Sequence, residues 1–315
     1  MDNIPDLKTI NEAQNRIKPF IHKTPVLTNN TINKMAGCEI FFKCENMQKC
    51  GAFKMRGASN AVFSLTDEEA QKGVITHSSG NHAGALALAA RNRNIPAYII
   101  MPENAPKVKI AAVEGYGGQI TFCEPTLQAR ESTAEARKKE TGAVMIHPYD
   151  DYRIIAGAST AAAELIDEVS GLDFILAPVG GGGLISGTAI SSFYMDPEIK
   201  VIACEPENAN DAYLSFKKGE IVKIGTPDTV ADGLRTMLSD KTFGIISRYV
   251  NNIVTVTEDE IIGAMKMIWE RMKVIIEPSS AVPVAVAISK KADLEKKRIG
   301  LILSGGNVDL GKLPF

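Results

Sequence analysis

The chain has 315 residues, of which 45% are hydrophobic and 23% charged, a composition typical of a folded globular protein with room for two lobes. A formal net charge of −2 argues against a nucleic-acid or membrane-surface partner. No apolar stretch approaches the roughly 18 residues of a membrane span, and the N-terminus lacks the pattern of a signal peptide, so we expect a cytoplasmic protein. Five cysteines without a C-x-x-C pair predict neither a disulfide framework nor a zinc site.

Short β-rich segments alternate with amphipathic helical segments along most of the chain. This alternation predicts an α/β fold built on open parallel sheets with helices on both faces. Capping boxes at Thr66 with Glu69 and at Thr257 with Glu260 predict two helix starts. Further helices are predicted at 82–93, 127–139 and 156–169, and strands at 39–43, 74–77, 97–101, 119–123, 143–147, 174–179, 200–205 and 298–304.

The domain organisation follows from the spacing of these elements. Residues 73–147 contain four strands in quick succession and predict the core of a small domain, which we place at 51–150. The flanking parts, 1–50 and 151–315, would then join into one discontinuous larger domain. Ligand sites in such sheets lie beyond the carboxyl ends of the strands, where most of the glycine- and serine-rich turns fall.

Lys54 is the first candidate for chemistry. A lone lysine at the start of a helix is usually a solvated surface charge. Here Phe53 and Met55 flank it, with small residues on either side, and they indicate a tightly packed turn. An amine in an apolar pocket has a depressed pKa and becomes a nucleophile for carbonyl groups.

The second candidate is the segment 77–84, His-Ser-Ser-Gly-Asn-His-Ala-Gly, which follows one predicted strand and opens a helix. Polar side chains and free amides at a helix N-terminus suit a carboxylate or an oxyanion. An ordinary N-cap explains one such residue, but not five polar or glycine residues in a row. His77 and His82 lack further ligands nearby, so the segment does not predict a metal site.

Four consecutive glycines at 180–183 lie between a predicted strand and a helix that begins near Leu184. Free amides and the helix dipole make such a turn a seat for a phosphate. The P-loop pattern is absent, and the glycine spacing does not fit the dinucleotide fingerprint. We therefore expect a smaller phosphorylated ligand.

Together these segments resemble the fold-type II pyridoxal-phosphate enzymes, specifically the serine racemase and serine/threonine dehydratase family. Further matching motifs are Lys-Cys-Glu-Asn at 43–46, Ala-Asp-Gly at 231–233, Glu-Pro at 277–278 and Leu-Ser-Gly-Gly-Asn at 303–307. The resemblance implies a tryptophan-synthase-β-like fold of two open parallel-sheet lobes, with the cofactor pyridoxal 5'-phosphate in the cleft between them. It also implies a homodimer.

The resemblance assigns roles residue by residue. It makes Lys54 the Schiff-base lysine and places Ser79 on the opposite face of the substrate Cα, so that two acid/base groups permit racemisation. A hydroxyl at Ser304 would face the pyridine nitrogen without keeping it protonated, which suits elimination better than transamination. The cofactor would contact Phe53, Lys54, Asn81, Gly180, Gly181, Gly182, Gly183, Leu184 and Ser304, and the substrate would contact Ser78, Ser79, Asn81, His82 and Arg130.

The family's divalent-cation site resembles Glu205, the carbonyl of Ala209 and Asp211. A set of oxygen ligands with two carboxylates suits Mg²⁺, Mn²⁺ or Ca²⁺. The alternative is that Asp211 caps a helix and Glu205 lies on the surface.

Several positions depart from the family. Tyr149 stands where animal serine racemases have asparagine, and 157–160 reads Gly-Ala-Ser-Thr in place of Gly-Gln-Gly-Thr. Gly84 replaces a glutamine that contacts nucleotide, so we expect no activation by ATP. Because the chain stops at Phe315, we expect no C-terminal regulatory domain and no feedback by isoleucine.

These inferences predict β-elimination of L-serine or L-threonine to pyruvate or 2-oxobutyrate and ammonia, with serine racemisation as a possible second activity. A 3-hydroxyaspartate dehydratase is one alternative and would need a further cation for the second carboxylate. A β-replacement enzyme resembling cysteine synthase is another, although 47–54 lacks the Pro-Thr-Gly-Ser run expected there. An alternative of a different class is a non-catalytic sensor that binds a phosphorylated ligand.

Overall fold

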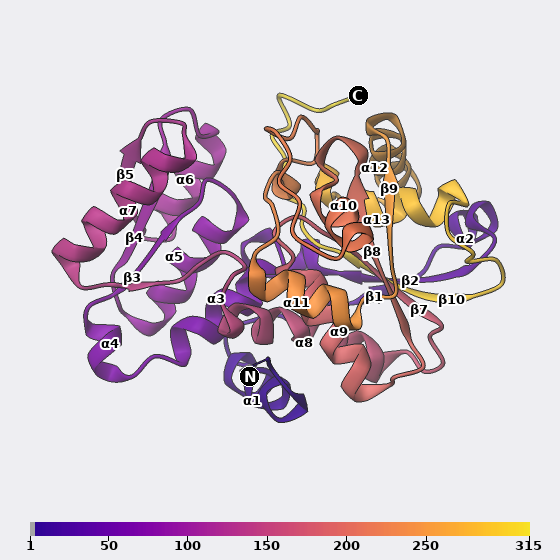
Figure 1. Cartoon of the computed structure of the whole chain (residues 1–315), viewed down its shortest axis with the longest axis horizontal. Helices are drawn as coiled ribbons and strands as arrows, with labels where there is room; N and C mark the ends of the chain where they lie inside the picture. Colours follow the sequence, from indigo (N-terminus) through magenta and orange to yellow (C-terminus); the bar gives the residue numbers. More distant parts are fainter. Residues whose placement is uncertain (1–3) are drawn as a thin grey trace.

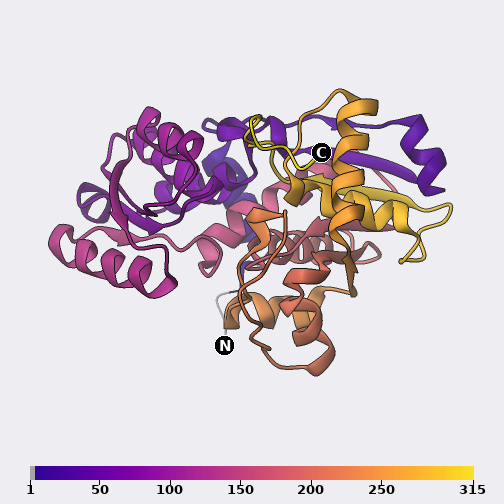
Figure 2. The same cartoon turned by 90° about the horizontal axis from the view of Figure 1, so that it is seen from above.

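Two β-sheets lie side by side in the computed structural model, which describes residues 4–315 (Figures 1 and 2). Within these residues the larger sheet has six strands in the order β1-β2-β10-β7-β8-β9, and the smaller has four in the order β5-β4-β3-β6. Neighbouring strands run parallel except β1 and β2. The strands are β1 (Val26–Leu27), β2 (Glu39–Cys44), β3 (Val74–His77), β4 (Ala97–Pro102), β5 (Gln119–Cys123), β6 (Val144–Met145), β7 (Phe174–Pro178), β8 (Lys200–Pro206), β9 (Asn252–Val256) and β10 (Arg298–Leu303).

Helices cover both faces of the six-stranded sheet. In β7, Leu176 packs with α2, α12 and α13, whereas Ile175 and Ala177 pack with α8, α9 and α11. Alternate side chains of a strand point to opposite faces, so an apolar strand contributes to two cores. The α-helices are α1 (Leu7–Ile17), α2 (Asn30–Ala36), α3 (Lys54–Phe63), α4 (Asp67–Gln71), α5 (Asn81–Arg93), α6 (Lys107–Gly115), α7 (Leu127–Thr141), α8 (Tyr152–Glu168), α9 (Gly183–Met195), α10 (Asp211–Lys218), α11 (Asp240–Tyr249), α12 (Glu258–Met272) and α13 (Pro278–Ser289). Short 3₁₀ helices are η1 (Glu45–Met47), η2 (Lys49–Gly51), η3 (Glu207–Ala209) and η4 (Asp232–Leu234).

The four-stranded sheet is covered in the same way. Ile99 of β4 packs in a core with α3, α5 and α6, whereas the next residue, Ile100, packs in a second core with α7. Each lobe therefore has helices on both sides of its sheet, as the alternation of elements predicts. Within residues 4–315, none of the helices combines the length and the apolar run needed to span a bilayer.

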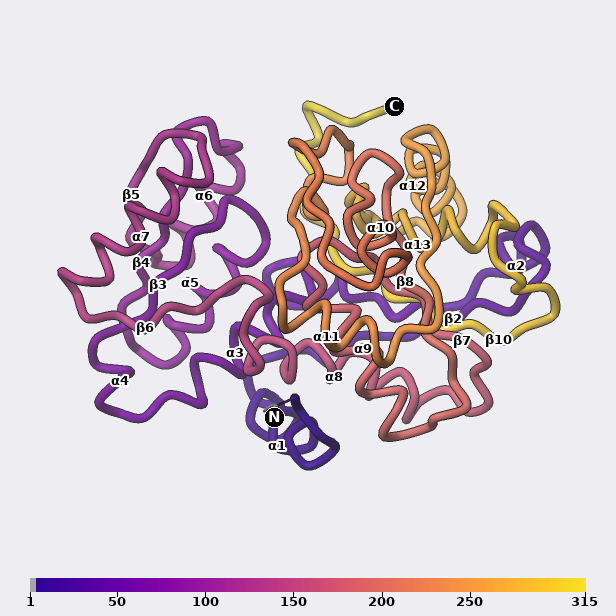
Figure 3. The backbone as a smooth tube through the Cα atoms, viewed as in Figure 1, coloured from indigo at the N-terminus to yellow at the C-terminus, as the bar shows by residue number. Residues whose placement is uncertain are grey.

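The chain passes between the two sheets through two helices. It leaves the six-stranded sheet after β2 and runs through α3 to β3, and it returns from β6 through α8 to β7 (Figure 3). These helices approach closely at two glycines. A Cβ on Gly157 would lie 2.5 Å from the carbonyl oxygen of Arg56, and a Cβ on Gly57 would lie 2.9 Å from that of Ile154. The outgoing and returning crossings are therefore in direct contact.

The predicted α/β fold with two open, largely parallel sheets is confirmed, and both predicted capping boxes are present. Seven of the eight predicted strands agree with the structure to within one residue at each end. The strand predicted at 143–147 is too long, because only Val144–Met145 pairs with β3 before the chain turns at Pro148, which has no N–H for a sheet. The helix predicted at 156–169 begins earlier, at Tyr152, where Asp151 caps it.

Two strands were not predicted. Strand β1 has two residues and is too short to show a pattern, whereas β9 lies in a recognisable β-branched run directly before the capping box at Thr257. The domain boundaries at 50/51 and 150/151 stay a prediction, because sheet membership does not show where one folding unit ends. Residues 1–3 of the predicted large domain lie outside the described residues.

Candidate active site

Lys54 begins helix α3, and its side chain lies between the two lobes. Its Nζ donates a hydrogen bond to the carbonyl oxygen of Pro148 at 2.9 Å and lies 5.0 Å from the centre of the Phe53 ring. Burial lowers the pKa of Lys54 to about 8, and the negative charge of Glu277 opposes this shift. More of the amine is therefore uncharged near neutral pH than in an ordinary lysine, and the uncharged form can act as a nucleophile.

The glycine loop connects β7 to α9 and presents an open helix N-terminus. Gly182 is the N-cap of α9 in a left-handed conformation, with φ of +89°, and no side chain caps the helix. The Gly181 N–H donates to Thr236 Oγ1 at 2.8 Å. The first N–H groups of a helix have no intrahelical acceptor, so Gly183 and Leu184 present amides to an anion.

Tyr149 covers this loop. A Cβ on Gly181 would lie 2.3 Å from the Tyr149 ring, and one on Gly183 would lie 3.0 Å from the Tyr149 Cβ. Because Tyr149 directly follows Pro148, whose carbonyl binds the Lys54 amine, the same short segment touches both the lysine and the glycine loop. The structure thus brings Lys54 and the glycine loop at 180–183 together.

The serine–asparagine loop opens a second helix without a side-chain cap. Helix α5 begins at Asn81, its N-cap is Gly80, and the Gly80 N–H donates to Ser78 Oγ at 3.3 Å. Within residues 4–315 the Ser79 hydroxyl makes no hydrogen bond to a protein group. The loop therefore offers a free hydroxyl and free amides, as an anionic substrate group requires.

Asn81 is already engaged by the other lobe. Its Nδ2 donates to the two carboxylate oxygens of Glu277 at 2.9 and 3.1 Å, and its Oδ1 accepts from Asn307 Nδ2 at 3.0 Å. Asn81 also lines a cavity with Gly80, Gly84 and Asn307. A contact between Asn81 and a cofactor ring would have to share or replace one of these bonds.

The three histidines around the loop have lowered pKa values. Burial lowers the pKa of His82 to about 3 and of His147 to about 4, and it also lowers the pKa of His77, with a further contribution from Arg130. The His82 ring is buried, with Nε2 3.2 Å from the carbonyl oxygen of Ile146, so His82 offers a ligand its backbone N–H. Arg130, which lies close enough to affect His77, is the permanent cation of this group.

Ser304 follows β10 and adjoins the lysine. Its carbonyl oxygen accepts the Phe53 N–H at 2.9 Å, and its hydroxyl lies 3.0 Å from that of Ser280, which also donates to the Gly305 carbonyl at 2.6 Å. The Ser304 side chain is buried and has a hydroxyl neighbour, not a carboxylate. The structure thus brings Ser304 next to the Phe53–Lys54 segment, from about 250 residues away along the chain.

Glu277 is a site residue to which sequence reasoning gave no role. Burial raises its pKa to about 7, with a further contribution from Asp232. Gly305 leaves room for it, because a Cβ there would lie 2.6 Å from the Glu277 carboxylate. In the sequence, only the Glu-Pro motif at 277–278 pointed to Glu277. A motif gives the position of a residue but not the groups that it contacts.

Glu205 and Asp211, predicted to bind a cation with the carbonyl of Ala209, lie in the large lobe. Glu205 accepts the N–H groups of Ala212 and Tyr213 at 3.0 and 2.8 Å. Asp211 accepts that of Leu238 at 2.9 Å. Both carboxylates are buried, and in the described part of the chain neither pairs with a basic side chain.

Burial raises the pKa of Glu205 well above its usual range and that of Asp211 to about 6. Two buried acids without a counter-ion fit a hard cation, which would remove the cost of their burial. Residues 4–315 contain no cluster of three or more His, Cys, Asp or Glu side chains arranged for a metal, so such a site would depend on backbone and water oxygens as well. Glu205 is not on the surface, contrary to the alternative considered from the sequence.

The groups between the lobes fit a small aldehyde that carries a phosphate. They comprise a half-buried amine with a lowered pKa, two helix N-termini without side-chain caps, and the buried hydroxyl of Ser304. The amine can bond covalently to a carbonyl carbon, and the α9 N-terminus can bind a phosphate. Pyridoxal phosphate has both groups and a ring nitrogen for the hydroxyl.

Comparison with known proteins gives a consistent result. Residues 17–305 match the protein family described as "Pyridoxal-phosphate dependent enzyme". The chain is 52% identical over 311 residues to a serine racemase of Dictyostelium discoideum, covering 98% of this chain and 96% of the relative. It is 50% identical over 312 residues to a beta-hydroxyaspartate dehydratase of Paracoccus denitrificans, covering 99% of both. The structure of maize serine racemase superimposes with a TM-score of 0.96 at 45% identity, covering 98% of this chain and 95% of the maize chain.

Proposed function

The chain belongs to the family of pyridoxal-phosphate dependent enzymes, and on this premise we propose that it eliminates the β-hydroxyl group of L-serine or L-threonine. The products are pyruvate or 2-oxobutyrate, together with ammonia. Racemisation of serine at the same site is the second activity that we propose, supported by the 52% identity to a serine racemase over nearly the whole chain. The homodimer implied by the sequence resemblance belongs to the same proposal.

The position of the Lys54 amine carries the proposal. It is half-buried, and desolvation lowers its pKa to about 8. It is bound to the Pro148 carbonyl, and the residue that follows Pro148 packs on the glycine loop. An amine in this setting, on a residue whose neighbour Phe53 binds the Ser304 carbonyl oxygen, supports covalent chemistry on the α-carbon of an amino acid.

Bound here, pyridoxal phosphate would withdraw electrons from the α-carbon of an attached amino acid and make its proton acidic. The amides of Gly183 and Leu184 would hold the phosphate, and the Ser78–His82 loop would hold the substrate carboxylate. Lys54 Nζ, uncharged once the substrate has replaced it, accepts the Cα proton from one face. The Ser79 hydroxyl serves the other face, so that a proton can be removed or returned on either side.

Protonation of the β-hydroxyl completes the elimination, since water leaves more readily than hydroxide. We propose that Lys54, protonated by the Cα, supplies this proton from the same face. Its lowered pKa makes the protonated amine a stronger acid than an ordinary lysine at neutral pH.

We also propose that Glu205, the Ala209 carbonyl and Asp211 hold a divalent cation. The support is the pair of buried carboxylates, whose pKa values are raised by burial and which have no basic partner in the described residues. The cation would stabilise the segment between β8 and α10. Strand β8 pairs with β7, the strand that leads into the glycine loop.

A second candidate is a 3-hydroxyaspartate dehydratase. It is favoured by the 50% identity to a beta-hydroxyaspartate dehydratase and by Arg130. Arg130 lies near His77, which precedes the substrate loop, and burial lowers the pKa values of His77 and the neighbouring His147. It is the group that could pair with a second carboxylate.

The test measures keto acid and ammonia from L-serine, D-serine, L-threonine and both 3-hydroxyaspartates, with D-serine formation followed by chiral chromatography. Keto acid from L-serine or L-threonine supports the first candidate. Turnover of 3-hydroxyaspartate alone would replace it with the second, and turnover of none would reject both. Ser79→Ala is the matched variant: we expect it to abolish D-serine formation and to retain part of the elimination from L-serine.

A further inference from the structure

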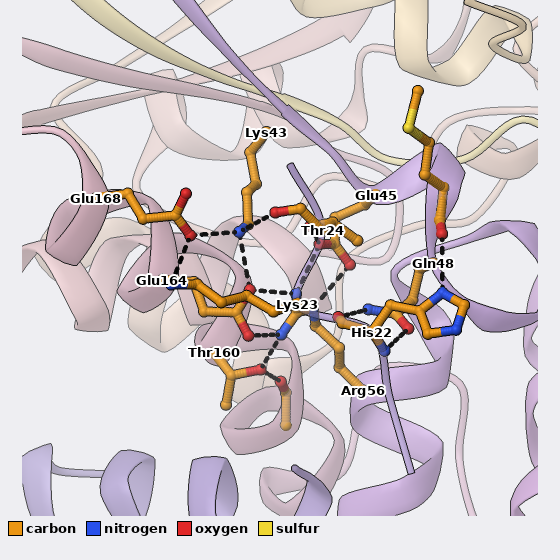
Figure 4. A network of polar contacts seen from close by, with 12 residues as sticks. His22, Lys23, Thr24, Lys43, Glu45, Gln48, Arg56, Thr160, Glu164 and Glu168 are labelled. Atoms are coloured by element: carbon orange, nitrogen blue, oxygen red, sulfur yellow. Dashed lines mark hydrogen bonds and ion pairs between the residues drawn. The ribbon is translucent and has the colours of Figure 1, made fainter. Parts of the chain in front are cut away.

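A network of six charged side chains lies where the chain crosses between the lobes (Figure 4). Three are basic and three acidic, so the network is neutral, and Lys43, Glu45 and Arg56 within it have no exposed side-chain surface. Burying charges is costly unless each is paired and hydrogen-bonded, which is the case here. The members are Lys23, Lys43, Glu45, Arg56, Glu164 and Glu168.

Arg56 is the centre of this network. Its guanidinium binds Glu45 through two bonds of 2.7 and 2.8 Å and Glu164 through two bonds of 2.7 and 2.8 Å. It also donates to Thr160 Oγ1 at 3.1 Å. Two bidentate pairs on one planar guanidinium fix both its position and its orientation, which an ammonium group cannot reproduce.

These bonds join three segments of the chain. Glu45 follows β2, Arg56 lies in the first turn of α3, and Glu164 lies on α8. Lys43 ties the same Glu164 to the end of β2 at 2.8 Å and also donates to the Thr24 carbonyl oxygen at 2.8 Å. The network therefore clamps the outgoing crossing to the returning one, beside the close contact of Gly57 and Gly157.

Arg56 lies two residues after Lys54 on the same helical turn. Two residues correspond to a rotation of about 200° around a helix, so the two side chains point in nearly opposite directions. The Lys54 amine reaches Pro148 between the lobes, whereas Arg56 reaches back to Glu45 and Glu164. The N-cap of α3, Phe53, has no capping side chain, so Arg56 supplies the polar anchor of this helix start.

We propose that Arg56 is the positioning residue of Lys54, and this inference rests on the catalytic role proposed for Lys54. By fixing the back of the first turn of α3 to Glu45 and Glu164, Arg56 sets the depth and direction at which the Lys54 amine enters the site. A misplacement of about 1 Å in such a group can cost about 100-fold in rate. Loosening this turn would also give the amine more access to water.

The test compares Arg56→Lys with Arg93→Lys. Arg93 binds the other end of the same helix, where it donates to the carbonyl oxygens of Val62 and Leu65, so it is the matched control for the stability of α3. For each protein, the thermal midpoint, kcat, KM and the pH midpoint of pyridoxal-phosphate loading are measured. Loading is followed by the yellow absorbance of the lysine-bound cofactor.

We expect Arg56→Lys to lower kcat about 10- to 100-fold with little change in KM, and to shift the loading midpoint toward higher pH. Arg93→Lys lowers the thermal midpoint but leaves kcat and the loading midpoint at the wild-type values. Equal effects of the two variants, or a folded Arg56→Lys with an unshifted loading midpoint, would overturn the proposal.

If Arg56→Lys does not fold, Glu164→Gln tests the role of Arg56 in its place, because this variant retains the Arg56–Glu45 pair. It must then shift the loading midpoint in the same direction, and an unshifted midpoint overturns the proposal. The proposed function has a separate outcome. A wild-type protein that stays colourless with pyridoxal phosphate rejects that function, whereas a yellow wild type with unshifted variants rejects only the role of Arg56.

Discussion

Asn81 Nδ2 lies 2.9 and 3.1 Å from the two carboxylate oxygens of Glu277, and this contact joins the start of α5 in one lobe to the start of α13 in the other. Asn307 completes it by donating to Asn81 Oδ1 at 3.0 Å. The contact fixes which way the Asn81 amide points. It also places a carboxylate close enough to Lys54 to raise its pKa against the effect of burial.

Replacing Glu277 with glutamine should therefore make Lys54 reactive at lower pH. The ammonium form cannot attack an aldehyde, so loading of pyridoxal phosphate should rise with pH through the Lys54 pKa of about 8 in the wild type. Removing the Glu277 charge removes the group that raises this pKa, and the midpoint falls. The pH dependence of pyridoxal-phosphate loading, followed by absorbance, gives this midpoint. Glu39→Gln, at the start of β2, is the control and should leave the midpoint unchanged.

Gly181→Ala should destabilise the protein through Tyr149. The new Cβ would lie 2.3 Å from the tyrosine ring, so the ring or the loop must move, at a cost of about 1–3 kcal/mol. Urea denaturation of Gly181→Ala, of a Tyr149 variant and of the double variant gives the coupling energy between positions 181 and 149. We expect this energy to exceed about 0.5 kcal/mol. Strictly additive effects would contradict the contact. Gly263→Ala is the control, because nothing lies within 4 Å of its added Cβ in helix α12.

Ser304→Asp should change the reaction outcome. A carboxylate at this buried position would favour a protonated ring nitrogen and a stronger electron sink, so a larger fraction of turnovers should end in transamination. The pyridoxamine phosphate formed per keto acid released measures this fraction. Ser304→Asn has a similar size without the charge and should not raise it. An equal rise in both variants would show that charge is not the cause.

Divalent cations should stabilise the cofactor-free protein through Glu205 and Asp211. Magnesium, manganese or calcium at about 100 times its dissociation constant would add about 2.7 kcal/mol of stability, visible as a higher thermal midpoint. Glu205→Gln should lose most of this increase. Glu207→Gln, an exposed neighbour in η3, should keep it. A shift that survives in Glu205→Gln would place the cation elsewhere.

Much of this fold follows from local pattern, because strands and capped helices are specified by neighbouring residues. The capping boxes at Thr66 and Thr257 and the strand at 74–77 are examples. The short strand β1 could not be predicted, since two residues are too few to show an alternation of apolar and polar side chains. Its strand conformation depends on its pairing with β2.

The contacts of the site were less predictable than its residues. Lys54, Asn81 and Ser304 could be named from local motifs, but the partners of Lys54 and Asn81 are 94 and 196 residues away along the chain. The bond between Arg56 and Glu164 spans 108 residues. Such pairs depend on how α3 and α8 pack, and no local pattern in one sequence encodes that packing.

The measurement that bears most directly on the proposed chemistry is the absorbance of the purified protein after addition of pyridoxal phosphate, compared between wild type and Lys54→Ala. We predict a yellow, lysine-bound cofactor in the wild type that borohydride reduction attaches permanently to the peptide containing residue 54, and no such product in Lys54→Ala. A wild-type protein that stays colourless, or a Lys54→Ala variant that becomes equally yellow through another lysine, would contradict the assignment of Lys54.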